Sequence, residues 1–319
     1  MQKWVASISV LLLLVKFAAY YLTHSVAVLT DALESIVNVS AGFIGLYSLW
    51  VSSKPRDADH PYGHGKAEFL SAAIEGTMIG AAGAIILYKA VQHIIDPVAL
   101  KEIDLGILLV SVTAIVNLIV GLLCLRTGRK NKSAALIASG HHLLSDTWST
   151  IGIVAGLGLL YFTKIAWIDS AVAFVFGLYI IWTGYKILRS SIAGIMDEAD
   201  MEILENMVRL LNANRRENWI DLHNLRVIKY GSVLHVDCHL TVPWYHNVAA
   251  AHREIEALAI LIQKEYGQSL ELFVHNDPCL PISCPICAKA DCRERQHDFQ
   301  KRVEWTLENI SENKKHELY

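Results

Sequence analysis

Residues 26–50 read VAVLTDALESIVNVSAGFIGLYSLW, an apolar stretch that is interrupted near its start by Asp31, Glu34 and Asn38. About 20 mostly apolar residues are enough to cross the hydrocarbon core of a bilayer as a helix. The stretch therefore predicts a transmembrane helix with polar side chains at membrane depth. Ionisable groups cost about 2.5–3.5 kcal/mol each at the centre of a span, so they usually serve a function there.

Five other stretches have similar length and character, at residues 4–22, 68–93, 105–125, 135–162 and 165–188. The first of them lacks the small-residue cleavage site of a signal peptide, so it is also predicted to span the membrane. Most Lys and Arg residues of the short loops fall on one side, among them Arg126 and Arg129, whereas the opposite loops carry Lys101 and Lys164. The positive-inside rule then predicts a multi-pass protein of the plasma or inner membrane with both termini in the cytoplasm.

A soluble domain is expected after the six spans, because the chain is rich in charge from Asp197 onward. Helical periodicity and strand-like alternation follow one another in the order α-β-β-α-β, at residues 199–215, 220–229, 232–242, 247–266 and 269–275. This order predicts a small α+β domain, ferredoxin-like or metallochaperone-like, with helices on one face of a sheet. The expected parts are a transmembrane domain at 1–195, a cytoplasmic domain at 196–278, and a Cys-rich linker with a C-terminal helix (about 294–312) at 279–319.

Two pairs of polar residues in the second and fifth predicted spans have i, i+4 spacing: Glu34 with Asn38, and His142 with Asp146. This spacing puts both members of a pair on one helix face, a turn apart. Two such faces opposed across a helix interface would bring four N and O ligands to one point, as a tetrahedral Zn²⁺ site requires. The alternative is that each residue hydrogen bonds between helices. Asp31, one turn before Glu34, is expected to support the ligands or to lie at the helix N-terminus.

The run TDALESIVN at residues 30–38, the loop HPYGHGKAE at 60–68 and the sequence HLLSD at 142–146 together resemble the signature of the cation diffusion facilitator family. The resemblance extends over roughly residues 5–278. It implies a homodimeric exporter that exchanges a cytoplasmic divalent cation for protons at the four-residue site. It also implies a Lys66–Asp197 pair at the membrane boundary that holds two protomers in register; the alternative is two unrelated interfacial charges.

The second span departs from the family pattern, which usually has Asp or His at the first ligand position and Asp at the second. Here these positions are Glu34 and Asn38, so only Glu34 and Asp146 supply negative charge to a dication. Zn²⁺ is the first expectation, with Fe²⁺, Mn²⁺, Co²⁺ and Cd²⁺ as alternatives, because oxygen-rich ligands weaken selectivity for zinc. Metal ligands must be deprotonated, so protons and metal compete, and His142 is expected to exchange its proton near physiological pH.

Two accessory metal sites are expected in the cytosolic parts of the chain. In the loop after the second span, Asp57, His60 and His64 have spacing that chelates one ion if the loop coils, and the family has a metal site there. The alternative is a turn with solvated histidines. By the resemblance, the soluble domain binds metal at a dimer interface through His239, His252, His275 and Asp277.

The C-terminal run Cys279-x4-Cys284-x2-Cys287-x4-Cys292 lies outside the common family pattern. Cys-x2-Cys is strong zinc-ligand spacing, and four thiols in a reducing cytosol favour a tetrahedral zinc site over disulfides. His275 or His297 is an alternative fourth ligand. A redox pair is the second interpretation. The sequence does not choose between a structural and a sensing role.

Two other classes of function compete with a transporter. An intramembrane metalloenzyme is not expected, because neither His-Glu-x-x-His nor Gly-x-Ser-x-Gly occurs. A membrane-tethered metal sensor would not need matched ligand pairs inside two spans. The net charge of −3 gives no reason to expect a nucleic-acid partner. The expected partners are metal cations, protons, the bilayer and a second copy of the chain, with no organic cofactor.

Overall fold

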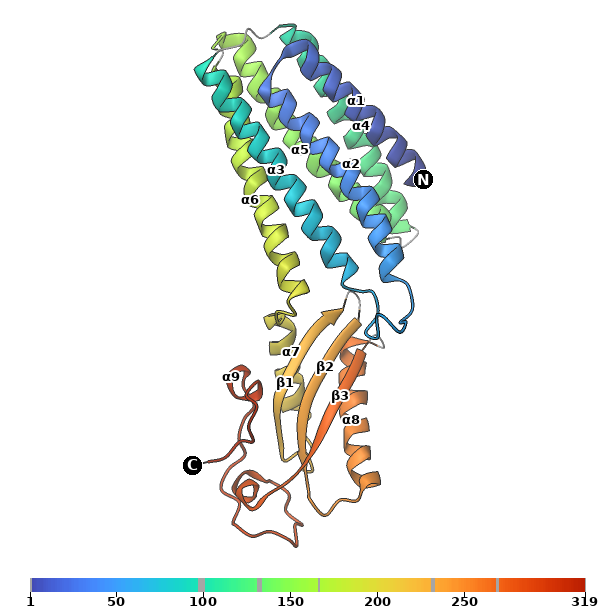
Figure 1. The fold of residues 1–319 in the computed structure, drawn as a ribbon, viewed down its shortest axis with the longest axis vertical. Coiled ribbons are helices and arrows are strands. Elements are labelled where there is room, and N and C mark those ends of the chain that lie inside the picture. Colours follow the sequence, from blue (N-terminus) through green and yellow to red (C-terminus); the bar gives the residue numbers. More distant parts are fainter. Residues whose placement is uncertain are drawn as a thin grey trace. The chain divides into compact units, whose positions relative to one another are not determined.

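The computed structural model describes residues 2–96, 101–130, 134–165, 167–230, 233–267 and 270–318. The chain divides into two compact units (Figure 1). The helical unit consists of Met1–Leu49 and Leu70–Ile192, and the C-terminal unit consists of Trp50–Phe69 and Ala193–Tyr319. The loop that joins the second and third helices therefore belongs to the C-terminal unit.

Long helices follow the predicted spans: α1 Gln2–Thr23, α2 Val26–Ser52, α3 Ala67–Ile95, α4 Ile103–Lys130, α5 Ala134–Thr163 and α6 Trp167–Ile195. Within the described residues, stretches of α2 to α6 are long and apolar enough to cross a membrane. The described apolar part of α1, Ser7–Thr23, is shorter. The predicted membrane α-helical fold class is confirmed.

The outward faces of these helices carry large apolar side chains, such as Phe43 and Tyr179, which are 61% and 64% exposed. Soluble monomers rarely expose extensive apolar surface, so lipid is the solvent that fits these faces. Where α3 and α6 meet, small residues allow a close backbone approach. A Cβ atom at Gly76 would lie 2.8 Å from the backbone nitrogen of Leu188. Association through glycine is common among membrane helices.

The start of α2 is fixed by a carboxylate from α6. Asp169 is buried, and it accepts hydrogen bonds from the Val26 N–H (2.7 Å) and from the Ser25 hydroxyl (2.5 Å). A helix leaves its first N–H groups without intrahelical partners, and a carboxylate there satisfies them and complements the helix dipole. This contact holds α2, which carries two of the predicted ligands, against α6.

The C-terminal unit contains α7 Met201–Ala213, β1 Asp221–Tyr230, β2 Val233–Val242, α8 Val248–Tyr266, β3 Leu270–Pro278, η1 Pro281–Ile286 and α9 Leu307–Ile310. The sheet has the order β1-β2-β3, with β1 antiparallel and β3 parallel to β2. Met207 of α7, Leu258 of α8 and Val236 and Leu240 of β2 are buried in one core cluster. Both helices therefore pack against the same sheet, and the predicted α-β-β-α-β order is confirmed.

The final helix is much shorter than the predicted one at 294–312, because only Leu307–Ile310 is helical. Side chains at the end of α7 and just beyond it donate hydrogen bonds to backbone carbonyls of the segment before this final helix. Arg215 donates to the Val303 carbonyl (2.6 Å), and Asn212 donates to the Trp305 carbonyl (2.6 Å). The Trp305 ring is 1% exposed in the core cluster. Tertiary hydrogen bonds and burial thus replace the local helix ladder that the polar composition favoured.

Candidate functional site

The predicted intramembrane ligands of α2 and α5 meet at Asp146. The Asn38 side-chain amide donates to both carboxylate oxygens of Asp146, at 3.2 and 3.1 Å. His142, one helical turn before Asp146, has its Nε2 atom 4.0 Å from Oδ2 of the same carboxylate. Asp146 is 9% exposed, whereas the His142 side chain is 50% exposed. The two helix faces therefore oppose each other, as the spacing predicts.

Glu34, the fourth predicted ligand, lies beside this group. Its Oε2 atom accepts a hydrogen bond from the Ser149 hydroxyl on α5 at 3.5 Å. In the described part of the chain, the ligand atoms of Glu34, His142 and Asp146 do not all lie within 4.8 Å of one another. The four predicted ligands are thus neighbours but are not arranged around one point, and their assignment as the transport site stays a prediction.

A cavity of about 380 Å³ adjoins the intramembrane ligands. Its lining includes Asn38, His142 and Asp146, a further amide at Asn117 of α4, and apolar residues from the second half of α2. A single water needs only about 10–15 Å³ of such volume. The cavity therefore has room for water and an ion beside the carboxylate of Asp146.

A buried lysine in α1, which was not among the predicted site residues, also lines this cavity. Lys16 is 2% exposed, lies 2.8 Å from Asp31 and donates to the Ser35 hydroxyl at 2.9 Å. Asp31 also accepts from Thr150 of α5 at 3.0 Å. Lys16 thus pairs with Asp31. Glu34 and Asp146 are thus the two carboxylates that the predicted site could offer to a dication. A lysine in the middle of an apolar helix was the available signal.

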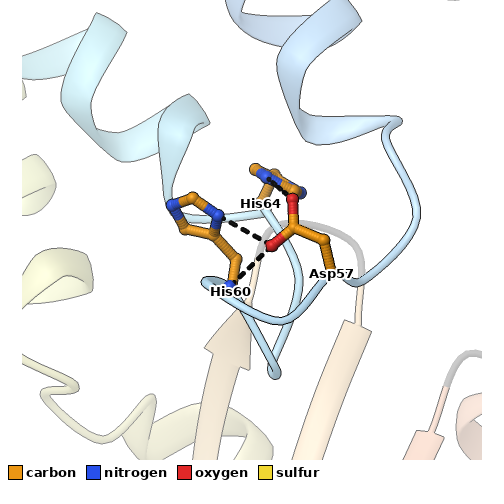
Figure 2. Close-up of side chains that lie close together, drawn as sticks. All are labelled: Asp57, His60 and His64. Carbon is orange, nitrogen blue, oxygen red and sulfur yellow. Dashed lines mark hydrogen bonds and ion pairs between the residues drawn. The ribbon is translucent and has the colours of Figure 1, made fainter.

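The loop between α2 and α3 brings Asp57, His60 and His64 together (Figure 2). His60 Nδ1 lies 3.0 Å from one Asp57 oxygen, and His64 Nε2 lies 3.4 Å from the other. The His60 backbone N–H also donates to Asp57 (2.7 Å), and this bond is the main cause that lowers the pKa of the Asp57 carboxyl below its ordinary value. The ligand atoms all lie within 4.8 Å of one another, so the three predicted ligands are close enough to share one ion; their assignment as a metal site stays a prediction.

A second cluster crosses the sheet of the C-terminal unit. His223 of β1 is opposite His239 of β2, which is opposite His275 of β3. The carboxylate of Asp277 lies 3.5 Å from His223, 3.3 Å from His239 and 3.8 Å from His275. Ligand atoms of His223, His239 and Asp277 all lie within 4.8 Å. Adjacent strands thus present a row of imidazoles to one carboxylate.

Two residues of this cluster differ from the prediction. His223 was not predicted, although its place on β1 opposite His239 would have been found by pairing the two predicted strands. His252, which was predicted, is exposed on α8, and the described contacts include no hydrogen bond or ion pair between it and the other members. Its role as a ligand stays a prediction.

The predicted charge pair lies within the C-terminal unit. Lys66 Nζ is 2.9 Å from Asp197 and also donates to the Ile195 carbonyl at 3.2 Å. The ammonium lies 4.7 Å from the centroid of the Tyr230 ring, a cation–π geometry. Burial is the largest single influence and lowers the pKa of Lys66, but the interactions with Asp197 and Tyr230 together outweigh it and the pKa is raised. The pair is formed within one chain.

The four C-terminal cysteines line one small cavity of about 40 Å³. All four are free thiols, and burial, together with the other thiols, raises the pKa of Cys279 and of Cys287. Within the described residues, these sulfur atoms do not form a cluster in which at least three lie within 4.8 Å of one another. The predicted zinc ligands thus share a cavity without being in contact around one point.

Two family models match consecutive parts of the chain. The cation efflux transmembrane domain matches residues 4–196, and the cytoplasmic domain of cation efflux proteins matches residues 199–279. These matches agree with the resemblance found in the motifs, and the family consists of transporters rather than enzymes.

Individual relatives agree with these models. An uncharacterized transporter of Synechocystis, sll1263, is 32% identical over 263 residues, which are 82% of this chain and 84% of that protein. The cation-efflux pumps FieF of Citrobacter koseri and Escherichia coli are 28% and 26% identical, over 84% of this chain and 89% of theirs. The chain is therefore a multi-pass integral membrane protein that belongs to the cation efflux, or cation diffusion facilitator, family.

Proposed function

We propose that this protein exports a divalent transition-metal cation, Zn²⁺ in the first place, from the cytoplasm in exchange for protons. The transport site is formed by Glu34, Asn38, His142 and Asp146. The observation that carries the proposal is the meeting of Asn38 and Asp146 beside a cavity that admits water, with His142 one turn away. Fe²⁺, Mn²⁺, Co²⁺ and Cd²⁺ are alternative substrates.

The chemistry of the ligands supplies the coupling to protons. Carboxylates and imidazole bind a transition metal only when they are deprotonated, so metal entering from the cytoplasm expels protons. Protons that arrive from the opposite side restore the acid forms and release the metal. His142 suits this exchange because its imidazole can bind either a proton or a metal ion and its side chain is half exposed. No further proton-carrying group is needed.

Orientation and assembly follow from the same reasoning. The Lys and Arg residues of the loops favour both termini in the cytoplasm of a plasma or inner membrane. The C-terminal unit joins two copies of the chain, and its cluster of His239, His275, Asp277 and the unpredicted His223 holds a metal ion there, with His252 as a further ligand. Within this unit, the pair Lys66–Asp197 joins the loop after α2 to the residues that follow α6.

The decisive experiment measures metal uptake into everted membrane vesicles with an acidic interior, separately for Zn²⁺, Fe²⁺, Mn²⁺, Co²⁺ and Cd²⁺. Wild type is expected to take up at least one of these ions, and collapse of the pH gradient is expected to stop uptake. His142→Ala is expected to lower uptake to that of vesicles without the protein, because it removes a ligand. His141→Ala, at the neighbouring position outside the cavity lining, is the matched control and is expected to retain uptake.

Each outcome separates one part of the proposal. Normal uptake by His142→Ala would overturn the assigned site. Uptake that ignores the pH gradient would overturn proton exchange. Metal binding by wild type without uptake of any ion would favour a membrane-tethered sensor, which needs only the C-terminal unit.

A further inference from the structure

The segment after β3 is an addition to the family domain. The match to the cytoplasmic domain ends at residue 279, so Cys284, Cys287 and Cys292 lie beyond it. The segment nevertheless packs against the domain. Cys287 and Ile286 are buried with Ile220, the residue that precedes β1. The backbone N–H of Cys279 donates to the Val242 carbonyl at the end of β2 (2.9 Å). The cysteines are therefore held at the end of the sheet where β2 and β3 finish.

The four cysteines approach one cavity from three different pieces of chain. Cys279 follows the end of β3, Cys284 and Cys287 belong to η1 and its C-terminal cap, and Cys292 lies in the turn beyond. The cavity measures about 40 Å³, more than the roughly 10–15 Å³ that one water needs. A single ion fits this space. Cys124 and Cys238 lie elsewhere, buried in α4 and in β2.

Two backbone N–H groups near the cysteines donate hydrogen bonds to sulfur atoms. The Trp244 N–H donates to Cys279 Sγ at 3.4 Å, and the Lys289 N–H donates to Cys287 Sγ. The Cys287 N–H in turn bonds the Cys284 carbonyl at 3.2 Å. Hydrogen bonds to the charged form stabilise a thiolate, and such outer partners orient the ligands of metal sites. The turn from Cys284 to Lys289 is thus already shaped to present two thiolates.

Positive charge is placed to balance thiolates. The Arg295 guanidinium donates to the carbonyls of Cys284 (3.1 Å), Cys287 (3.0 Å) and Lys289 (2.7 Å), and it lines the cavity together with Lys289. A dication bound by four thiolates leaves an excess of two negative charges. Arg295 offsets part of that excess, whereas Lys289 is itself paired with Asp291 (2.8 Å) and the carboxylate of Glu294 also lines the cavity.

We propose that Cys279, Cys284, Cys287 and Cys292 bind one Zn²⁺-like ion, which fixes the segment 281–303 to the end of the sheet where β2 and β3 finish. Each thiol gives up its proton and forms one sulfur–metal bond, so no oxidant or reductant takes part. Zn–S bonds of about 2.3 Å require sulfur atoms closer together than they lie here, so binding draws the turn inward. This site is separate from the transport site, and its role is structural.

The test uses the reduced full-length protein and Co²⁺ as the probe. Thiolate ligands give Co²⁺ a strong charge-transfer absorption in the near ultraviolet that nitrogen and oxygen ligands do not give, so transport and histidine sites do not interfere. Wild type is expected to bind one Co²⁺ per chain with this absorption, and Zn²⁺ is expected to displace it. Cys284→Ser and Cys287→Ser are expected to lose it, and Cys124→Ala, the matched control, is expected to keep it.

Further variants and readouts guard against misfolding. Arg295→Gln is expected to weaken Co²⁺ binding about 10–100-fold while the absorption survives. In wild type, bound metal is expected to protect the four thiols from alkylation, as mapped by mass spectrometry. Absent charge transfer in wild type, absorption that persists in Cys284→Ser, or alkylation that ignores metal would each overturn the proposal. So would disulfides among these cysteines in protein isolated from a reducing cytosol.

Discussion

The proposed transport site in the helices and the proposed metal site on the sheet are built in different ways. In the helical unit, the ligands lie on two helices, Glu34 stands beside the group, and neutral Asn38 occupies a position that faces the Asp146 carboxylate. In the C-terminal unit, His223, His239 and Asp277 lie on three hydrogen-bonded strands with their ligand atoms already within 4.8 Å.

The difference matches what each site has to do. Strands in one sheet are fixed relative to one another, so a cluster across them is organised before the metal arrives and suits long-lived binding. Helices in a bilayer pack through small residues, and ligands on two of them separate when the helices shift. A loosely gathered site can release its ion, which a transporter requires at every cycle.

Charge separates the two regions further. In the helical unit, the side chains of Lys16 and Asp31 are both buried, and Lys16 neutralises Asp31 through a contact of 2.8 Å. In the sheet cluster, Lys315 lies 3.5 Å from the Asp277 carboxylate, but its side chain is 19% exposed, so this cation is less deeply buried than Lys16. The membrane site therefore depends on a third helix, α1, that supplies no ligand.

Removal of that buried cation is expected to have the largest effect. Lys16→Met leaves Asp31 buried without its partner, which typically costs about 3–5 kcal/mol. Thermal unfolding in detergent or nanodiscs measures the loss. The double variant Lys16→Met/Asp31→Leu is expected to recover most of the stability, since no uncompensated charge remains. Equal instability of the single and the double variants would mean that the ion pair does not explain the role of Lys16.

Removal of an imidazole from the sheet is expected to weaken metal binding there more than the roughly 10–100-fold that outer partners of a metal cost. His239→Ala should therefore lose equilibrium binding at this cluster, and His223→Ala should behave in the same way. Uptake into vesicles is expected to persist in both, unlike in His142→Ala. His141→Ala, at an exposed position of α5, is the control. Abolished uptake in His239→Ala would erase the distinction between the two regions.

Replacing the neutral ligand Asn38 with an acid tests whether the charge at this position limits metal affinity in the helical unit. Asn38→Asp places a second carboxylate near Asp146, so we expect metal affinity to rise by about tenfold, or about 1.4 kcal/mol. Binding should also depend more steeply on pH, because one more proton must leave. Metal titration at several pH values measures both. Asn117→Asp adds charge elsewhere in the same cavity as a control, and an equal gain there would argue for general attraction rather than a ligand position.

The smallest effect is expected at the helix that supports the sheet. Asp200 caps α7 by accepting from the Ile203 N–H (3.2 Å), and it pairs with Lys229 of β1 (2.6 Å). Asp200→Ala is expected to cost about 1 kcal/mol in thermal unfolding followed by the fluorescence of the buried tryptophans. Glu205→Ala on an exposed position of α7 is the control. A cost as large as that of Lys16→Met would contradict the ranking.

The pH dependence of this last effect has a definite sign. The hydrogen bond from Lys229 is the main cause that lowers the pKa of Asp200 below its ordinary value. A carboxylate with a lowered folded-state pKa contributes stability above its unfolded pKa and loses it as the pH falls through the folded pKa. The difference between wild type and Asp200→Ala should therefore be complete at neutral pH and shrink in acid.

The sequence predicted most of what depends on local pattern. Apolar runs predicted the spans, alternation predicted the strands, and i, i+4 spacing predicted that Asn38 and Asp146 share a face with their partners. It missed His223, because a single histidine on a strand has meaning only when its neighbouring strand is known. It also predicted a final helix that is longer than the observed one. Composition alone does not show that Asn212 and Arg215 donate hydrogen bonds to the backbone carbonyls of the segment before that helix.

The sequence by itself determined the membrane class, the family and the residue types at the candidate sites, because periodicity and spacing are properties of neighbours along the chain. Only the tertiary structure decided that Lys16 pairs with Asp31, that Glu34 stands beside Asp146, and that the four C-terminal thiols share one cavity. The physical reason is that buried charges and thiols are satisfied by partners distant in sequence. Which partners they find depends on how whole helices and strands pack.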